Sequence, residues 1–230
     1  KNKMIIRLCT GVAACLVLCI AIPLGVYAGA YPKRASSKLI MSGSILGISL
    51  PSFWVGMMMI YIFAVVLRLL PASGRGNTVM VGNVALSIFA PGGIRYVILP
   101  AITLALTNVA TMLRLTRSGI LENMRQDYIK FARAKGVPAK SILFGHALKN
   151  ALIPVVTIFG MDLGNMIAFT TITETIFAWP GMGKLLIDAI NKSDRPIIVA
   201  YLMAAACMFV VLNFIVDILY TLIDPRIELR

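Results

Sequence analysis

The chain has 230 residues, of which 59% are hydrophobic and only 13% are charged. Soluble domains carry roughly 25% charged residues, so this composition excludes an ordinary soluble fold and indicates lipid as the main solvent. The net charge of +13 could suggest nucleic acid, but the basic residues fall in short loops between apolar runs. That placement favours anionic headgroups as the partner and argues against nucleic acid.

Five apolar runs are long enough to cross a bilayer, whose core of about 30 Å needs roughly 20 helical residues. They cover about residues 8–30, 50–70, 96–115, 151–177 and 197–223. An apolar lead-in from Leu39 precedes the second run, and Gly47 and Pro51 interrupt it. The sequence therefore predicts an all-α, polytopic helical bundle with about five transmembrane helices in a single domain, residues 1–230.

The distribution of Lys and Arg predicts how these helices are oriented. The most basic loop, at 114–149, should be cytoplasmic, and so should the C-terminus. Five spans then place Lys1, Lys3 and Arg7 outside, on the disfavoured side, and no signal peptide opens the chain. We therefore expect that a preceding span is missing from this sequence or was never part of this polypeptide.

The four cysteines all lie in apolar runs and form no CxxC pair, and His146 is the single histidine. This pattern predicts neither a disulfide framework nor a metal site. Met57, Met58 and Met59 are consecutive and point in three directions, so we expect them to be packing residues.

The predicted cytoplasmic loop, residues 116–150, has the densest pattern of the chain. Small residues at Ala132, Ala134 and Gly136 surround a turn, where glycine can end a helix and let the backbone approach a partner. Basic residues flank this turn: Arg133, Lys135 and Lys140. Two interpretations remain open from the residues alone. A short helix could enter a groove on another protein, or a basic amphipathic segment could lie on anionic lipid.

The stretch ARAKG followed by HALKNALIP resembles the cytoplasmic loop of permease subunits in bacterial ABC importers, in the dipeptide, oligopeptide and nickel branch. The loop departs from the general pattern of such permeases, because Lys130 replaces the acidic residue and Lys149 the final proline. Other stretches agree with the same branch: SLPSFWVGMM (49–58), LPASGRG (70–76), ILPAITLA (98–105), RLTRSGILE (114–122), TETIFAWPGMGKLLIDAI (173–190) and VDILYTLIDPRI (216–227).

The resemblance implies a multi-pass protein of the bacterial inner membrane, usually with six helices, that binds no cofactor and catalyses no reaction. Its implied partners are a homologous second permease, two ATPase subunits that use ATP and Mg, and an extracytoplasmic solute-binding protein. The loop helix would dock in a cleft of one ATPase. The residues implied as coupling contacts are Ala132, Arg133, Ala134, Lys135 and Gly136, with His146 and Lys149 in support. The implied substrates are peptides, or nickel and related small solutes.

The segment 178–195 follows the fourth run and is predicted to be an external interfacial helix. Its GMGK fragment is no phosphate loop, because Ala178 and Leu185 replace the required glycine and Ser/Thr. ATP is therefore expected to be handled by partners. Trp179 is predicted at headgroup level, and four apolar residues are predicted to face inward: Leu185, Leu186, Ile187 and Ile190.

Acidic residues inside a membrane are costly and suggest function. Asp162 and Asn165 lie one turn apart in the fourth run, so they could line a translocation pathway or make an interhelical hydrogen bond. Glu174, nearer the external interface, could act on the pathway or the binding protein, or serve as a solvated anchor.

The function predicted from these features is the permease subunit of an ABC importer. The alternative is a self-contained channel or secondary carrier, which the scarcity of intramembrane acids and the lack of an internal repeat disfavour. A membrane-embedded enzyme ranks third, because no catalytic set of side chains is evident.

Overall fold

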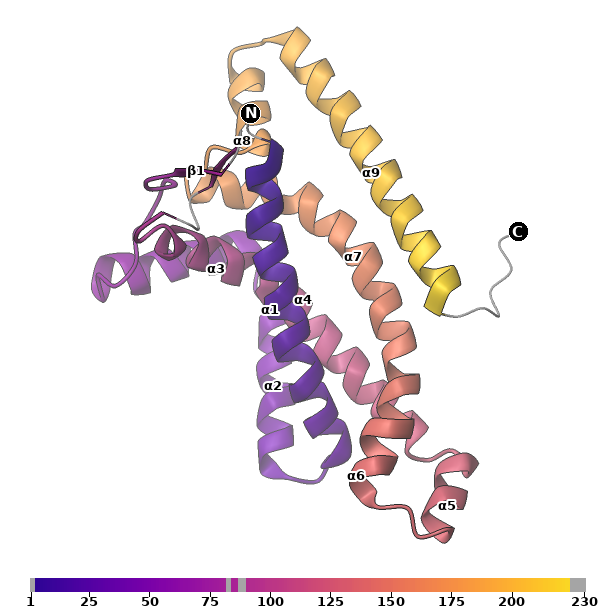
Figure 1. The fold of residues 1–230 in the computed structure, drawn as a ribbon. Helices are drawn as coiled ribbons and strands as arrows, with labels where there is room; N and C mark the ends of the chain where they lie inside the picture. Colours follow the sequence, from indigo (N-terminus) through magenta and orange to yellow (C-terminus); the bar gives the residue numbers. More distant parts are fainter. Residues whose placement is uncertain (1–2, 82–83, 87–89, 224–230) are drawn as a thin grey trace. The chain divides into compact units, whose positions relative to one another are not determined.

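The computed structural model describes residues 3–81, 84–86 and 90–223, and most of these residues are helical (Figure 1). Four helices are long: α1 (Lys3–Ala30), α4 (Ile94–Asn123), α7 (Leu148–Ile176) and α9 (Arg195–Ile223), with 28, 30, 29 and 29 residues. At about 1.5 Å per residue each exceeds the roughly 30 Å of a bilayer core. The predicted all-α membrane fold is confirmed.

Shorter elements connect the long helices. Between α1 and α4 lie α2 (Ala35–Ser49), α3 (Ser52–Met59), the π-helix η1 (Ile60–Val66) and the strands β1 (Val79–Val81) and β2 (Val84–Leu86). The strands pair antiparallel, with Val79 opposite Leu86. Between α4 and α7 lie α5 (Asp127–Ala134), α6 (Ala139–Ser141) and the π-helix η2 (Ile142–Ala147), and α8 (Met182–Asn191) precedes α9. The sequence analysis did not foresee the hairpin.

Within the described residues, three helices are each long and apolar enough to cross a membrane: Gly11–Ala30, Ile94–Asn123 and Ala139–Leu163. A fourth candidate is the pair α2 and α3–η1, which bends by 105° between Ser49 and Ser52. Pro51 lies in this break, where its missing N–H and its fixed φ disfavour a continuous helix. The break therefore falls at the start of the second predicted span, between that span and its apolar lead-in, and the bent pair is either one broken span or a re-entrant loop. The described apolar part of α9, Arg195–Val211, is shorter.

Backbone contacts divide the chain into two compact units, each built from three segments. The first unit comprises Lys1–Cys15, Leu50–Thr107 and Leu163–Asn213, and the second comprises Leu16–Ser49, Asn108–Asp162 and Phe214–Arg230. The segment between α4 and α7 lies entirely in the second unit.

Glycines allow close helix packing in the second unit. An added Cβ at Gly25 of α1 would lie 2.6 Å from Thr116 Cβ of α4, and one at Gly29 would lie 2.7 Å from Ile120 Cβ. At Gly119 of α4 an added Cβ would lie 3.1 Å from Ala151 Cβ of α7. Small residues spaced four apart let membrane helices approach closely, which here brings α1 and α7 against α4.

The first unit has a core around the end of α7. Phe177 is buried, and the backbone N–H of Gly74 donates a hydrogen bond of 2.9 Å to its carbonyl oxygen. Trp179 is only 3% exposed, so it packs inside this unit, and its location at headgroup level stays a prediction. The inward orientation predicted for α8 is wrong for Leu185 and Ile190, which are 49% and 50% exposed.

Candidate functional site

The candidate site is the exposed end of α5 in the second unit. Asp127 occupies the first turn of this helix, where a negative charge interacts favourably with the helix dipole. Lys130 Nζ donates a hydrogen bond of 2.8 Å to Asp127 Oδ1. That hydrogen bond, together with the positive charge of Lys130, lowers the pKa of Asp127. Both side chains are exposed, so the pair contributes little to stability.

Gly136 ends α5 in a Schellman motif. Its φ of +77° lies in the left-handed region that favours glycine. Its N–H donates to Arg133 O at 3.0 Å, and the N–H of Val137 donates to Ala132 O at 3.1 Å. Ala132 and Val137, the two ends of this second hydrogen bond, also pack on the core of the second unit. The sequence-based prediction that glycine terminates this helix is confirmed.

Four of the predicted coupling residues form the exposed tip of α5. Arg133, Ala134, Lys135 and Gly136 are all exposed, whereas Ala132 is half-buried. No other described group lies within 4 Å of a Cβ built at Gly136, so the tip is open to a partner. Next to it, Lys135 Nζ lies 4.4 Å from the ring centroid of Phe131, a side chain that is 62% exposed.

The remaining two predicted coupling residues belong to other elements than this tip. His146 belongs to η2 and Lys149 to the first turn of α7, and both are exposed. The segment that carries them does contact α5, because α5 packs against η2. The structure therefore places them on the supporting segment rather than on the tip.

A buried apolar residue attaches α5 to the rest of the second unit. Ile129 is 0% exposed and belongs to a core cluster with five other residues: Val26, Ile120, Ile142, Ala147 and Ala151. These come from α1, α4, η2 and α7, so the short helix rests on the ends of three long ones. Displacement of α5 would disturb this cluster directly.

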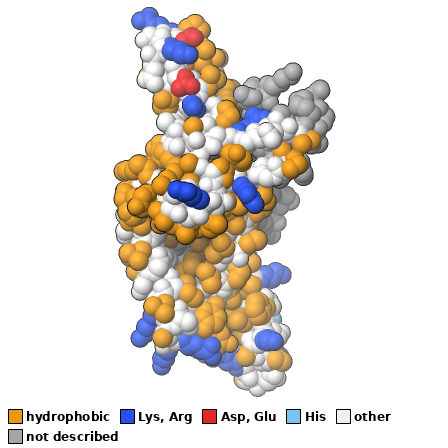
Figure 2. Space-filling model, turned by 90° about the vertical axis from the view of Figure 1, so that its left-hand side faces the viewer, with side chains coloured by type: hydrophobic (Ala, Val, Ile, Leu, Met, Phe, Trp, Pro, Cys, Tyr) orange, Lys and Arg blue, Asp and Glu red, His pale blue; other side chains and the backbone are white. Residues whose placement is uncertain are grey.

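Basic side chains gather at the end of the second unit that carries α5. Figure 2 shows Lys and Arg at the lower end, where Figure 1 places the α1–α2 turn, α5 and α6, below a mainly hydrophobic surface. The exposed basic residues of these segments are Lys33, Arg34, Lys38, Lys130, Arg133, Lys135 and Lys140. The positive-inside rule associates such a cluster with the cytoplasmic side. Sidedness itself stays a prediction.

The structure describes the side chains of two of the three predicted pathway residues. Asp162 lies in α7 and is half-buried, and the side chain of Asn165 lies outside the described residues. Glu174 is 5% exposed. Because it is buried, the prediction that Glu174 is a solvated anchor is wrong. A pathway role for the three residues stays a prediction.

The carboxylate of Glu174 caps α8. Its Oε2 accepts a hydrogen bond of 3.0 Å from the N–H of Lys184, and the N–H of Gly183 also donates to the carboxylate. A Cβ at Gly181 would collide with this carboxylate, and one at Gly183 would collide with Thr171. The GMGK fragment is therefore a capped helix start, fitted closely to the end of α7. The sequence analysis missed this cap, for which two glycines around the start of α8 were the available signal.

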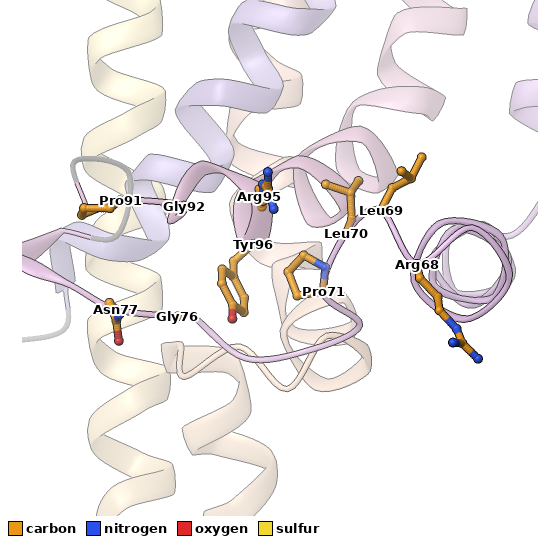
Figure 3. Close-up of a pocket in the computed structure, with 10 residues that line it drawn as sticks. All are labelled: Arg68, Leu69, Leu70, Pro71, Gly76, Asn77, Pro91, Gly92, Arg95 and Tyr96. Carbon is orange, nitrogen blue, oxygen red and sulfur yellow. The ribbon is translucent and has the colours of Figure 1, made fainter.

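A pocket of about 490 Å³ lies in the first unit between η1 and the start of α4 (Figure 3). Its lining residues are Arg68, Leu69, Leu70, Pro71, Gly76, Asn77, Pro91, Gly92, Arg95 and Tyr96. Arg68 points away from Arg95, so their guanidinium groups do not converge on one ligand (Figure 3). Tyr96 packs on Gly76, where a Cβ would lie 2.5 Å from the ring.

The family model of binding-protein-dependent transport system inner membrane components matches residues 21–229. The chain belongs to this family. The resemblance found in the loop motifs is therefore confirmed, and the protein is a multi-pass membrane protein of the permease type.

Curated relatives agree with this assignment. The chain is 42% identical over 201 residues to the di/tripeptide transport system permease protein DppB of Pseudomonas aeruginosa (strain UCBPP-PA14), covering 82% of this chain and 60% of that protein. It is 41% identical over 217 residues to the oligopeptide transport system permease protein AppB of Bacillus subtilis (strain 168), covering 94% and 67%. It is 36% identical over 224 residues to the dipeptide transport system permease protein DppB of Escherichia coli (strain K12), covering 91% and 66%. The chain thus spans about two thirds or less of these relatives.

A solved structure supports the fold. The chain is similar to a chain of the MetNI methionine ABC transporter in an inward-facing conformation, with a TM-score of 0.70 over 95% of this chain and 93% of that chain. The sequence identity is 14%, so this likeness shows the fold alone.

Proposed function

We propose that this protein is the translocation subunit of a bacterial ABC importer for peptides, driven by separate ATPase subunits that dock on the tip of α5. The observation that carries the proposal is family membership over residues 21–229. The relatives above are named as di/tripeptide, oligopeptide and dipeptide permeases, which supports peptides as the substrate class. Nickel and related solutes have no such support.

The geometry of α5 favours docking on a protein over lying on lipid. A helix that lies on lipid turns its apolar face towards the bilayer. Here Ile129, on the apolar side of α5, is already buried in the core of the second unit. The exposed end instead carries Ala134 and Gly136, with open space around the glycine. Small residues at a helix tip let a partner's groove enclose the backbone.

The protein contributes no chemical step in this proposal. ATP and Mg are used by the two ATPase subunits, and a second permease and an extracytoplasmic binding protein complete the importer. ATP binding would shift the complex between inward-open and outward-open states, because the ATP-bound ATPases bind one state of the permease more tightly than the other. The helical bundle would lie in the bacterial inner membrane, with the basic end that carries α5 facing the cytoplasm.

Reconstitution of the full-length permease with its genetically linked partners in proteoliposomes tests the proposal. Uptake of a labelled di- or tripeptide should require ATP, the binding protein and intact ATPases. The matched control uses ATPase subunits whose phosphate-loop lysine is replaced, which should abolish uptake while leaving the complex assembled. Uptake that continues with these inactive ATPases would contradict the proposal and favour a self-contained carrier.

A further inference from the structure

The side chain of Tyr128, the second residue of α5, makes hydrogen bonds to two long helices. Its hydroxyl donates to Asn123 Oδ1 at the end of α4, with an O···O distance of 2.8 Å. The same hydroxyl accepts from Asn150 Nδ2 at the start of α7, with an N···O distance of 3.0 Å. The hydroxyl therefore donates its single proton to α4 and accepts a hydrogen bond from α7.

The two asparagines lie beside a close approach of α4 and α7. Asn123 Nδ2 donates to Gly119 O at 2.9 Å, which orients the amide so that Oδ1 faces Tyr128. Gly119 is the residue whose added Cβ would lie 3.1 Å from Ala151 Cβ, and Ala151 follows Asn150 directly. The Tyr128 hydroxyl thus joins α5 to a point where α4 and α7 are closely packed.

We propose that the Tyr128 hydroxyl is a positioning group that transmits movement of α5 to α4 and α7 together. The inference rests on the proposed function, in which partner ATPases move α5. The apolar contact of Ile129 holds α5 to the core but fixes no direction, because hydrophobic contact is non-directional. Hydrogen bonds are directional, so the bridged hydroxyl fixes where the start of α5 lies against both helix ends.

Tyr128→Phe tests the inference, because it removes the hydroxyl and leaves the ring. We expect the complex to assemble and to hydrolyse ATP, while peptide transported per ATP falls roughly two- to tenfold, the range that one neutral hydrogen bond represents. A purely structural role would reduce assembly or thermal stability instead of this ratio. Tyr201→Phe on α9 is the matched control, since its hydroxyl makes no hydrogen bond within the described part of the chain, and it should leave the ratio unchanged.

A double-mutant cycle tests whether Tyr128 acts through its hydrogen bond with Asn150. Asn150→Ala should lower the ratio by a similar factor, and the double variant should show no further fall, because both changes break one link. The inference is overturned if Tyr128→Phe transports normally per ATP, if the two changes are additive, or if ATPase co-purification is lost. Failure of the proposed function would look different: the unmodified permease itself would not co-purify with ATPases or would transport without ATP.

Discussion

Replacing Gly136 separates docking from folding, because the described chain leaves open space around this residue. Its φ of +77° makes any L-residue there cost roughly 1–2 kcal/mol. Since nothing lies within 4 Å of an added Cβ, no steric cost within the chain adds to this strain. Gly136→Ala and Gly136→Glu therefore carry the same backbone cost, which is small against a typical folding stability of about 5–15 kcal/mol.

The two variants differ in what they present to a docked partner. Glutamate extends a long, negatively charged side chain from the tip of α5, whereas alanine adds one methyl group. We expect similar thermal unfolding temperatures for both variants, with ATP-driven uptake abolished by Gly136→Glu and retained to a greater extent by Gly136→Ala. Uptake, co-purification of the ATPases and unfolding temperature should be measured on the same preparations.

Two results would refute this reasoning. Normal uptake by an assembled Gly136→Glu complex would show that the tip is not a docking surface. Equal loss of uptake in both variants, with equal loss of assembly, would show that backbone strain alone is responsible.

Three further substitutions test the structure around the site. Gly25→Ala places a Cβ 2.6 Å from Thr116 Cβ and should lower the free energy of unfolding by about 1–3 kcal/mol, measured by thermal unfolding. Gly43→Ala is the control, because nothing lies within 4 Å of a Cβ there, and it should not destabilise the protein. Equal effects of the two changes would refute the packing argument. Glu174→Ala removes the carboxylate that caps α8, which should destabilise the start of this helix by about 1–3 kcal/mol and speed hydrogen exchange of its first amides. Unchanged exchange would contradict the cap. Asp162→Ala should change transport rate or substrate range if Asp162 lines the pathway, and unchanged kinetics for every tested peptide would leave it a packing role.

The sequence predicted those features that depend on local pattern. Long apolar runs gave the helical membrane fold, because the thickness of a bilayer sets the length of a spanning helix. Gly136 predicted the end of α5, because few other residues adopt a positive φ readily. Gly47 and Pro51 indicated an interruption before the second run, but the 105° bend depends on packing that a pattern does not encode.

Features that depend on contacts between distant residues were missed or wrong. The burial of Trp179 inside the first unit was missed, because a general preference of tryptophan for the membrane interface says nothing of its packing partners. Glu174 reaches Lys184 across a turn, and Tyr128 reaches Asn150 across 22 positions. Each of these hydrogen bonds joins two different helices, so the periodicity within one helix could not reveal it.

The central claim is that the tip of α5 is the cytoplasmic docking surface for a separate ATPase. A single cysteine at Ala134, in a chain whose four native cysteines are replaced, tests it most directly. The account predicts that an impermeant thiol reagent labels this cysteine only from the cytoplasmic side, and that a short cross-linker joins it to an ATPase subunit in the assembled importer. Labelling from outside the cell, or no cross-link in a complex that transports, would contradict it.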